Sequence, residues 1–182
     1  MRKTILLAGV ALLGVTACGD RVELSTRHNS EAHASAYTVG DLCQGFLEFI
    51  QNELQVMDAT WSPPEGHQED SSIGFSGICK IGTTNYGASV ANLQAWNPQL
   101  KTVREPDSEG YQRQEGYDDS HVWISDDNEF YVQVDEWVMD LYFRKNGPIE
   151  TASGDLIFDE NTNGKIVQYL DRTARDIGAR RK

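Results

Sequence analysis

The clearest pattern of metal-binding side chains stands near the C-terminal end of the sequence. Asp159, Asn161 and Asn163 alternate with other residues and precede Gly164. In the first half of a calcium-binding loop, alternate oxygen side chains converge on one point, and a glycine at the sixth position permits the sharp turn. The sequence therefore suggests calcium as a cofactor, held weakly by these three side chains.

Two features of the same segment favour a different role. Leu170 stands at the twelfth position, where a calcium loop has a bidentate Glu, and residues 155–158 have the pattern of a strand where a helix should precede the loop. Asp, Asn, Thr and Gly are also the residues of a turn followed by a helix N-cap. A calcium site and a capped helix are both open interpretations of this segment.

No other pattern carries a catalytic set. Gly74-Phe75-Ser76-Gly77 lacks the second spacer of the G-x-S-x-G motif and lies on a predicted strand. The four histidines are scattered, and the sequence has no H-E-x-x-H zinc motif. Adjacent acidic residues on a strand point to opposite faces and do not readily share a proton. We therefore predict that the protein is not an enzyme. The adjacent acidic pairs are Asp118-Asp119, Asp126-Asp127 and Asp135-Glu136.

Residues 1–17 have the composition of a secretory signal peptide. Arg2 and Lys3 precede an apolar stretch from Ile5 to Val15, and a short cationic start followed by about 7–15 apolar residues is typical of secretion signals. The stretch is shorter than the roughly 20 apolar residues that a membrane-spanning helix needs. It ends in Val15-Thr16-Ala17-Cys18, which resembles the lipobox of bacterial lipoproteins.

This resemblance implies that Cys18 receives a lipid and becomes the first residue after cleavage. Two or more acyl chains anchor a protein stably, so we expect the protein at the extracytoplasmic face of the cell membrane. The alternative is an ordinary signal peptide with a chance cysteine. Residues 18–37 have few apolar side chains and are typical of a flexible tether. Residues 38–182 are enough for one globular domain.

The assignment of Cys18 to the lipid leaves Cys43 and Cys79. An even number of cysteines in an oxidising compartment indicates a disulfide. Such a bond would join the first predicted helix to an early strand. Two separately buried thiols are the alternative.

The net charge of the chain is −12. Phosphate backbones repel so acidic a protein, which makes nucleic acid a poor partner. Anionic lipid headgroups also repel the domain, so we expect it to stand away from the membrane that holds its anchor.

Hydrophobic periodicity predicts an α+β fold, in which an N-terminal and a C-terminal helix pack on one antiparallel sheet as a two-layer sandwich. The first helix should begin at Thr38, with Asp41 completing a capping box, and end at residues 62–66. The last should run from residue 162 to 177 and stop at Gly178. Strands are expected at residues 73–81, 88–96, 121–125, 129–134, 137–144 and 155–158, with a bulge or bend at 135–136.

Two regions could contact a ligand. Residues 97–120 are polar and long for a loop, so they are either functional or mobile. Trp123, Tyr131 and Tyr142 alternate with inward-facing residues and should line the opposite face of the sheet. That face is an exposed aromatic surface unless helices cover both sides.

Two short motifs extend the resemblance to lipoproteins. Asp41-Leu42-Cys43 opens the first predicted helix, and Gly77-Ile78-Cys79-Lys80-Ile81 places a second cysteine on an early strand. With the lipobox and tether, they make residues 38–178 similar to a group of small actinobacterial lipoproteins of unknown function. The group often has Trp at the position of Ile81 and a further Cys in the closing helix. The resemblance implies a fold related to cell-envelope binding domains, and it supplies no catalytic residues.

We therefore predict a lipid-anchored, non-catalytic module that binds an envelope protein or a small ligand through its sheet or through residues 97–120. One alternative is an enzyme that acts on envelope polymers, which should show a deep polar pocket with a carboxyl group of raised pKa. The other is a weak calcium-binding module.

Overall fold

The computed structural model describes residues 36–62, 69–84, 89–98, 105–106, 110–145 and 147–180. The predicted signal peptide, Cys18 and all of the predicted tether except its last two residues lie outside these ranges. None of the helices in the described part of the chain is long and apolar enough to cross a membrane.

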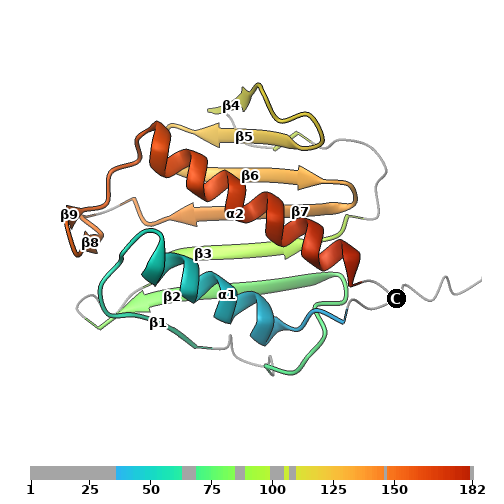
Figure 1. The fold of residues 1–182 in the computed structure, drawn as a ribbon, viewed down its shortest axis with the longest axis horizontal. Coiled ribbons are helices and arrows are strands. Elements are labelled where there is room, and N and C mark those ends of the chain that lie inside the picture. The colour runs from blue at the N-terminus through green and yellow to red at the C-terminus, as the bar shows by residue number, and fades with distance from the viewer. Residues whose placement is uncertain are drawn as a thin grey trace, which may run out of the picture. The chain divides into compact units, whose positions relative to one another are not determined.

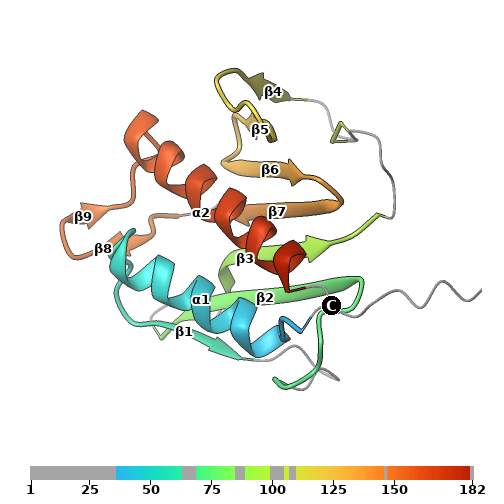
Figure 2. The same ribbon diagram turned by 45° about the vertical axis from the view of Figure 1, so that its right-hand side comes forward.

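The described residues form an antiparallel sheet of seven strands with two helices packed on it, which confirms the predicted α+β class. Figures 1 and 2 show both helices on the same face of this sheet, so the fold has two layers. The strand order is β1-β2-β3-β7-β6-β5-β4, and β8 and β9 form a separate small hairpin. The elements are α1 Val39–Asn52, β1 Ala59–Ser62, β2 Ser76–Thr83, β3 Ser89–Trp96, β4 Tyr111–Gln114, β5 His121–Ser125, β6 Glu129–Val134, β7 Trp137–Phe143, β8 Glu150–Thr151, β9 Gly154–Asp155 and α2 Glu160–Ala179.

The first helix begins as predicted. The side chain of Thr38 accepts a hydrogen bond from the backbone N–H of Asp41, and the Asp41 carboxylate accepts one from the backbone N–H of Thr38, each at 3.0 Å. This capping box satisfies two backbone donors that the first turn leaves unpaired. The predicted end is wrong, because Gln55 and Asp58 adopt φ angles of 56° and 54° and turn the chain into β1.

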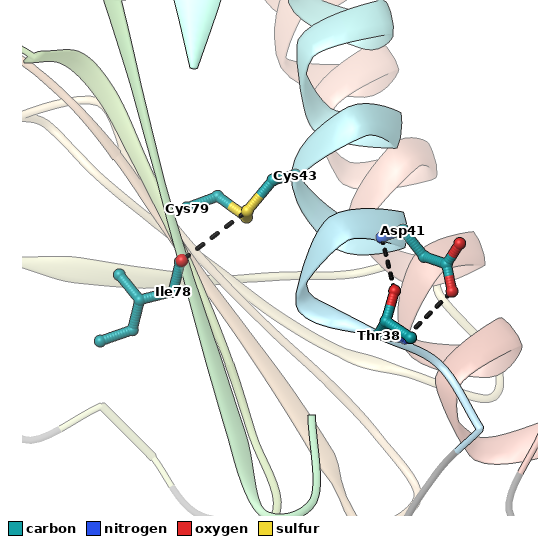
Figure 3. The surroundings of a disulfide bond; sticks show 5 residues. All are labelled: Thr38, Asp41, Cys43, Ile78 and Cys79. Atoms are coloured by element: carbon teal, nitrogen blue, oxygen red, sulfur yellow. Dashed lines mark hydrogen bonds between the residues drawn. A yellow bond between two sulfur atoms is a disulfide. The ribbon is translucent and has the colours of Figure 1, made fainter. Parts of the chain in front are cut away.

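A disulfide joins α1 to β2 between Cys43 and Cys79, as predicted (Figure 3). Their Cα atoms are 5.3 Å apart, and both side chains are fully buried. Gly77 makes this approach possible, because a Cβ atom there would lie only 3.1 Å from Cδ2 of Leu42. The disulfide and the glycine together hold the helix closely against the strand.

One tight turn sets the pairing of β6 with β7. Asp135 and Glu136 connect β6 to β7, and the partners Val134 and Trp137 flank them. Asp135 has a φ angle of 49°, which two-residue hairpin turns require and which Asp tolerates. The predicted bulge or bend is therefore a complete reversal, and β7 returns to pair with β3 at the centre of the sheet.

Three other predictions are corrected in the second half of the chain. Residues 111–114 form edge strand β4 inside the segment predicted as a loop. The strand predicted at residues 155–158 is wrong beyond its first residue, because Asp155 ends β9 and residues 156–158 belong to no strand. Gly178 lies within α2 and does not end it, because the helix continues to Ala179.

The main core lies between the helices and the sheet. The predicted inward residues of the central strands are buried there, and α1 meets α2 where Phe49 stacks on Tyr169 with ring centroids 4.3 Å apart. Phe75, which lies within the strand predicted at residues 73–81, precedes β2 and is 48% exposed. The residues of β5, β6 and β7 in this core are Val122, Phe130, Val132, Val134, Trp137, Met139, Leu141 and Phe143, and the partly buried Ile124 packs against it.

Candidate functional site

The face of the sheet opposite the two helices carries the alternate side chains of the central strands, and we call it the helix-free face. Side chains alternate between the two faces along a strand, and the other set is buried under the helices. The register aligns side chains of this face in rows across neighbouring strands. One row runs across β5, β6, β7 and β3 and contains Trp123, Tyr131, Asp140 and Gln94.

Aromatic side chains form a second apolar cluster on the helix-free face. Tyr131 is its centre: Trp123 meets it edge to face at 5.5 Å between ring centroids, Trp96 at 6.3 Å and Tyr111 at 6.5 Å. Val138 completes the cluster. Such edge-to-face contacts are favourable because the positive edge of one ring faces the negative face of another.

The predicted aromatic surface is thus present on the predicted face, but it is mostly covered. Trp123 and Tyr131 are buried, and Tyr142 is 44% exposed. The alternative, in which helices cover both faces, is wrong for the described residues. Tyr142 is therefore the ring of this predicted set that a ligand could contact directly.

Asp140 lies half-buried beside this cluster. Among the described residues, no hydrogen bond or ion pair reaches its carboxyl group. Burial raises the pKa of Asp140 to about 6, and the negative charge of Glu129 adds to the effect. A carboxyl group with a shifted pKa and no structural partner is a candidate for a functional site.

Glu129 is the diagonal neighbour of Asp140 on the adjacent strand, since it pairs with Tyr142 two residues further along β7. Diagonal neighbours of this kind have Cα atoms roughly 7–8 Å apart. The Tyr111 hydroxyl donates a hydrogen bond to Glu129 at 3.0 Å, and Lys145 lies 3.3 Å from its other carboxylate oxygen. Within the described ranges, Glu129 therefore has partners that Asp140 lacks.

Asp140 and Glu129 are eleven positions apart in the sequence, so no pattern of adjacent carboxylates predicts this pair. The strand register brings these two together across β6 and β7. One signal was available: Asp140 is the only charged residue in the strand Trp137–Phe143. A single charged side chain inside an otherwise apolar and aromatic strand is costly to bury. Its presence therefore marks Asp140 as a candidate functional residue.

On the helix side, a cleft of about 750 Å³ lies between the last turns of α2 and the turn from β6 to β7. A smaller cleft of about 280 Å³ lies along α2 beside residues 116–120, at the end of the predicted long loop. Arg175 borders both clefts and donates hydrogen bonds of 2.9 and 3.1 Å to Asp171. The larger cleft is lined by Val134, Asp135, Glu136, Trp137, Ala174, Arg175, Gly178 and Ala179.

The residues suggested for calcium lie at the start of α2. Asp159 is the N-cap of α2, and its carboxylate accepts a hydrogen bond from the backbone N–H of Thr162 at 2.8 Å, which lowers the pKa of Asp159. Asn161, Asn163 and Gly164 already lie in the helix. The described residues contain no group of three or more His, Cys, Asp or Glu side chains that could hold a metal ion. The capped-helix interpretation therefore describes the conformation of this segment.

Comparisons of the chain with protein-family models, with curated proteins and with solved structures found no match.

Proposed function

We propose that the protein is a lipid-anchored, non-catalytic module of the cell envelope that binds a ligand on its helix-free face. The signal-like residues 1–17, the lipobox ending at Cys18 and the polar tether support the anchor and the compartment. A disulfide between buried cysteines is typical of proteins in an oxidising compartment.

The observation that carries the binding proposal is Asp140. Its half-buried carboxyl group receives no hydrogen bond from any described residue, and an acceptor in such a position costs free energy until a donor reaches it. Tyr142 beside it offers an exposed ring, and Gln94 and Asn92 on β3 offer amide groups in the adjacent positions. The Asp140 carboxyl group suits a ligand that donates hydrogen bonds through hydroxyl or amino groups. The ring of Tyr142 suits a ligand that also has an apolar surface.

The anchor is tested separately from the site. Cells expressing the full chain are fed an alkyne-labelled fatty acid, and we expect label on the wild-type protein and its recovery with membranes. The Cys18→Ala variant should carry no label and leave the membrane fraction. Label that persists in this variant would contradict the assignment of the lipid to Cys18.

The binding face is tested with a photo-crosslinking amino acid in intact cells. At position 142 it should give a defined adduct, and at Glu48, an exposed position on α1, it should not. The Asp140→Asn substitution should weaken the adduct formed from position 142. Equal adducts from both positions, or an adduct unaffected by Asp140→Asn, would contradict binding on the helix-free face.

One observation favours a second function, an enzyme that hydrolyses an envelope polysaccharide. A carboxyl group with a pKa of about 6 can donate a proton near neutral pH, and Glu129 supplies a second carboxylate on the same face. Incubation of purified protein with envelope polysaccharide distinguishes the two functions. New reducing ends formed by the wild type, and not by Asp140→Asn or Glu129→Gln, would establish the enzyme and overturn the non-catalytic module.

A further inference from the structure

The larger cleft beside α2 has an apolar floor that the proposed function does not use. Val134 and Trp137 supply the sheet side of the floor, and Ala174 and Ala179 supply the helix side. Its volume of about 750 Å³ lies in the range of sites that hold small ligands or a few residues of a peptide. The small side chains of α2 leave the indole ring of Trp137 as the largest group in this cleft.

The indole nitrogen of Trp137 has no hydrogen-bond partner in the part of the chain that the structure describes. The side chain is only 2% exposed, and its indole nitrogen is buried with no hydrogen-bond acceptor among the described residues. Gly178 lies beside this edge of the ring, where a Cβ atom would stand 3.7 Å from Cδ1, the carbon bonded to the indole nitrogen. Buried hydrogen-bond donors are nearly always paired in native proteins. A ligand that brings an acceptor to the indole nitrogen, on the side of the ring next to Gly178, would supply the missing partner.

The rim of the cleft is acidic. Asp135 is exposed on the turn from β6 to β7, and Glu136 follows it. The one cation at the described rim, Arg175, is paired with Asp171, and the charges of Asp119 and Asp135 also act on it. The electrostatic field at the mouth of the cleft therefore favours a cationic ligand.

We propose that this cleft binds a short segment of a partner protein in which an apolar side chain stands next to Lys or Arg. The apolar side chain would lie on the exposed Ala179, above the buried Val134 and Ala174. A backbone carbonyl would accept from Trp137, and the cation would face Asp135. A peptide combines these three chemical groups in the space of a few residues. This site is independent of the helix-free face.

The proposal is tested with two acetylated and amidated pentapeptides, Gly-Leu-Lys-Lys-Gly and Gly-Leu-Glu-Glu-Gly, titrated calorimetrically into the mature protein. We expect at least tenfold tighter binding of the basic peptide, and weaker binding at high salt because exposed charges are screened. Replacement of Leu by Ala in the basic peptide should weaken binding about tenfold, since the apolar floor loses its contact.

Variants of the rim and the floor locate the site. The double substitution Asp135→Asn and Glu136→Gln removes two charges, while Asn tolerates the positive φ at 135 and Gln keeps an oxygen for the hydrogen bond from Asn97. It should weaken the basic peptide at least fivefold. Asp126→Asn, on an exposed turn between β5 and β6, is the matched control and should change nothing. Gly178→Leu should abolish binding by filling the space beside the indole ring.

Several results would overturn the proposal. These are no binding of the basic peptide to the wild type, equal binding of the acidic peptide, or equal loss of binding in Asp126→Asn and in the rim variant. Self-association of the protein that the rim substitutions abolish would assign the cleft to a second copy of this chain and would also overturn it. Circular dichroism of each variant establishes that lost binding is not lost folding.

Discussion

Asp140 lies directly opposite Tyr131 in the β6–β7 pair, so a half-buried carboxyl group adjoins the centre of the aromatic cluster. The folded state raises the pKa of this carboxyl group from 3.8 to about 6, mainly through burial. In the unfolded chain the same group has its ordinary pKa. Between these two values the folded state therefore binds a proton that the unfolded state has released.

The first prediction concerns the pH dependence that follows. As pH rises from about 4 to about 6, Asp140 should lower the free energy of unfolding by about 1–3 kcal/mol, because its ionisation is unfavourable only in the folded state. Asp140→Asn removes this loss, so its stability relative to the wild type should increase through that window and then level off. Urea unfolding at several pH values measures the difference, with Asp126→Asn as the control. A difference that is constant with pH would contradict the prediction.

The second prediction concerns the disulfide between Cys43 and Cys79. It closes a sequence separation of 36 residues, so its removal by Cys43→Ala with Cys79→Ala should lower the free energy of unfolding by about 2–4 kcal/mol. Because both residues are fully buried, reductant should act slowly on the native protein and quickly in denaturant. Urea unfolding with and without dithiothreitol measures both effects. If dithiothreitol also destabilised the double variant, its effect on the wild type could not be assigned to the bond between Cys43 and Cys79.

The third prediction separates the N-cap from the calcium interpretation at Asp159. Asp159→Ala should destabilise α2, because the backbone N–H of Thr162 loses its acceptor, whereas Asp159→Ser should retain most of the stability. The folded state lowers the pKa of Asp159, so the stability that the carboxylate adds is present above its ordinary pKa and is lost as pH falls through the lowered value. Thermal unfolding with millimolar calcium and with chelator should give the same difference between Asp159→Ala and wild type. If the stability difference between Asp159→Ala and the wild type were larger in calcium than in chelator, the result would support a calcium site at Asp159.

The fourth prediction uses Gly178 within the last turns of α2. Glycine in a helix is less favourable than alanine by up to about 1 kcal/mol, and a Cβ atom at this position meets Trp137 at an ordinary contact distance of 3.7 Å. Gly178→Ala should therefore stabilise the protein slightly. Gly164→Ala, where a Cβ atom would meet nothing within 4 Å, is the matched comparison. Chemical denaturation measures both, and destabilisation by Gly178→Ala alone would show that the space beside the indole ring is smaller than the structure indicates.

Local patterns predicted most of the elements because their signals lie within a few residues. The capping box at Thr38 and Asp41 marks the start of α1, and strict alternation marks β5, β6 and β7. Strands β1 and β4 were missed because each has four residues and lies at an edge of the sheet. Such strands bury little surface of their own, so their sequences carry only a weak alternation, and pairing with a neighbouring strand decides their conformation.

The candidate sites were harder to predict because they depend on pairing between distant residues. The aromatic face around Trp123 and Tyr131 followed from alternation alone, but its burial did not, because burial depends on which strands lie next to each other. Asp140 and Glu129 became neighbours only when the turn at Asp135 folded β7 back on β6. The cleft over Trp137 required the last turns of α2 to pack beside that same turn.

Residue spacing predicted the two amphipathic helices, the central strands and the two-layer arrangement, and the number of cysteines favoured the bond between Cys43 and Cys79 over two separate thiols. The strand order, with β7 between β3 and β6, is visible in the folded protein alone. That order follows from the total apolar area that distant segments bury together, which no local pattern contains. It also places Asp140 on the helix-free face beside Tyr131 and Glu129, and Trp137 beneath α2, the positions on which both proposed binding sites depend.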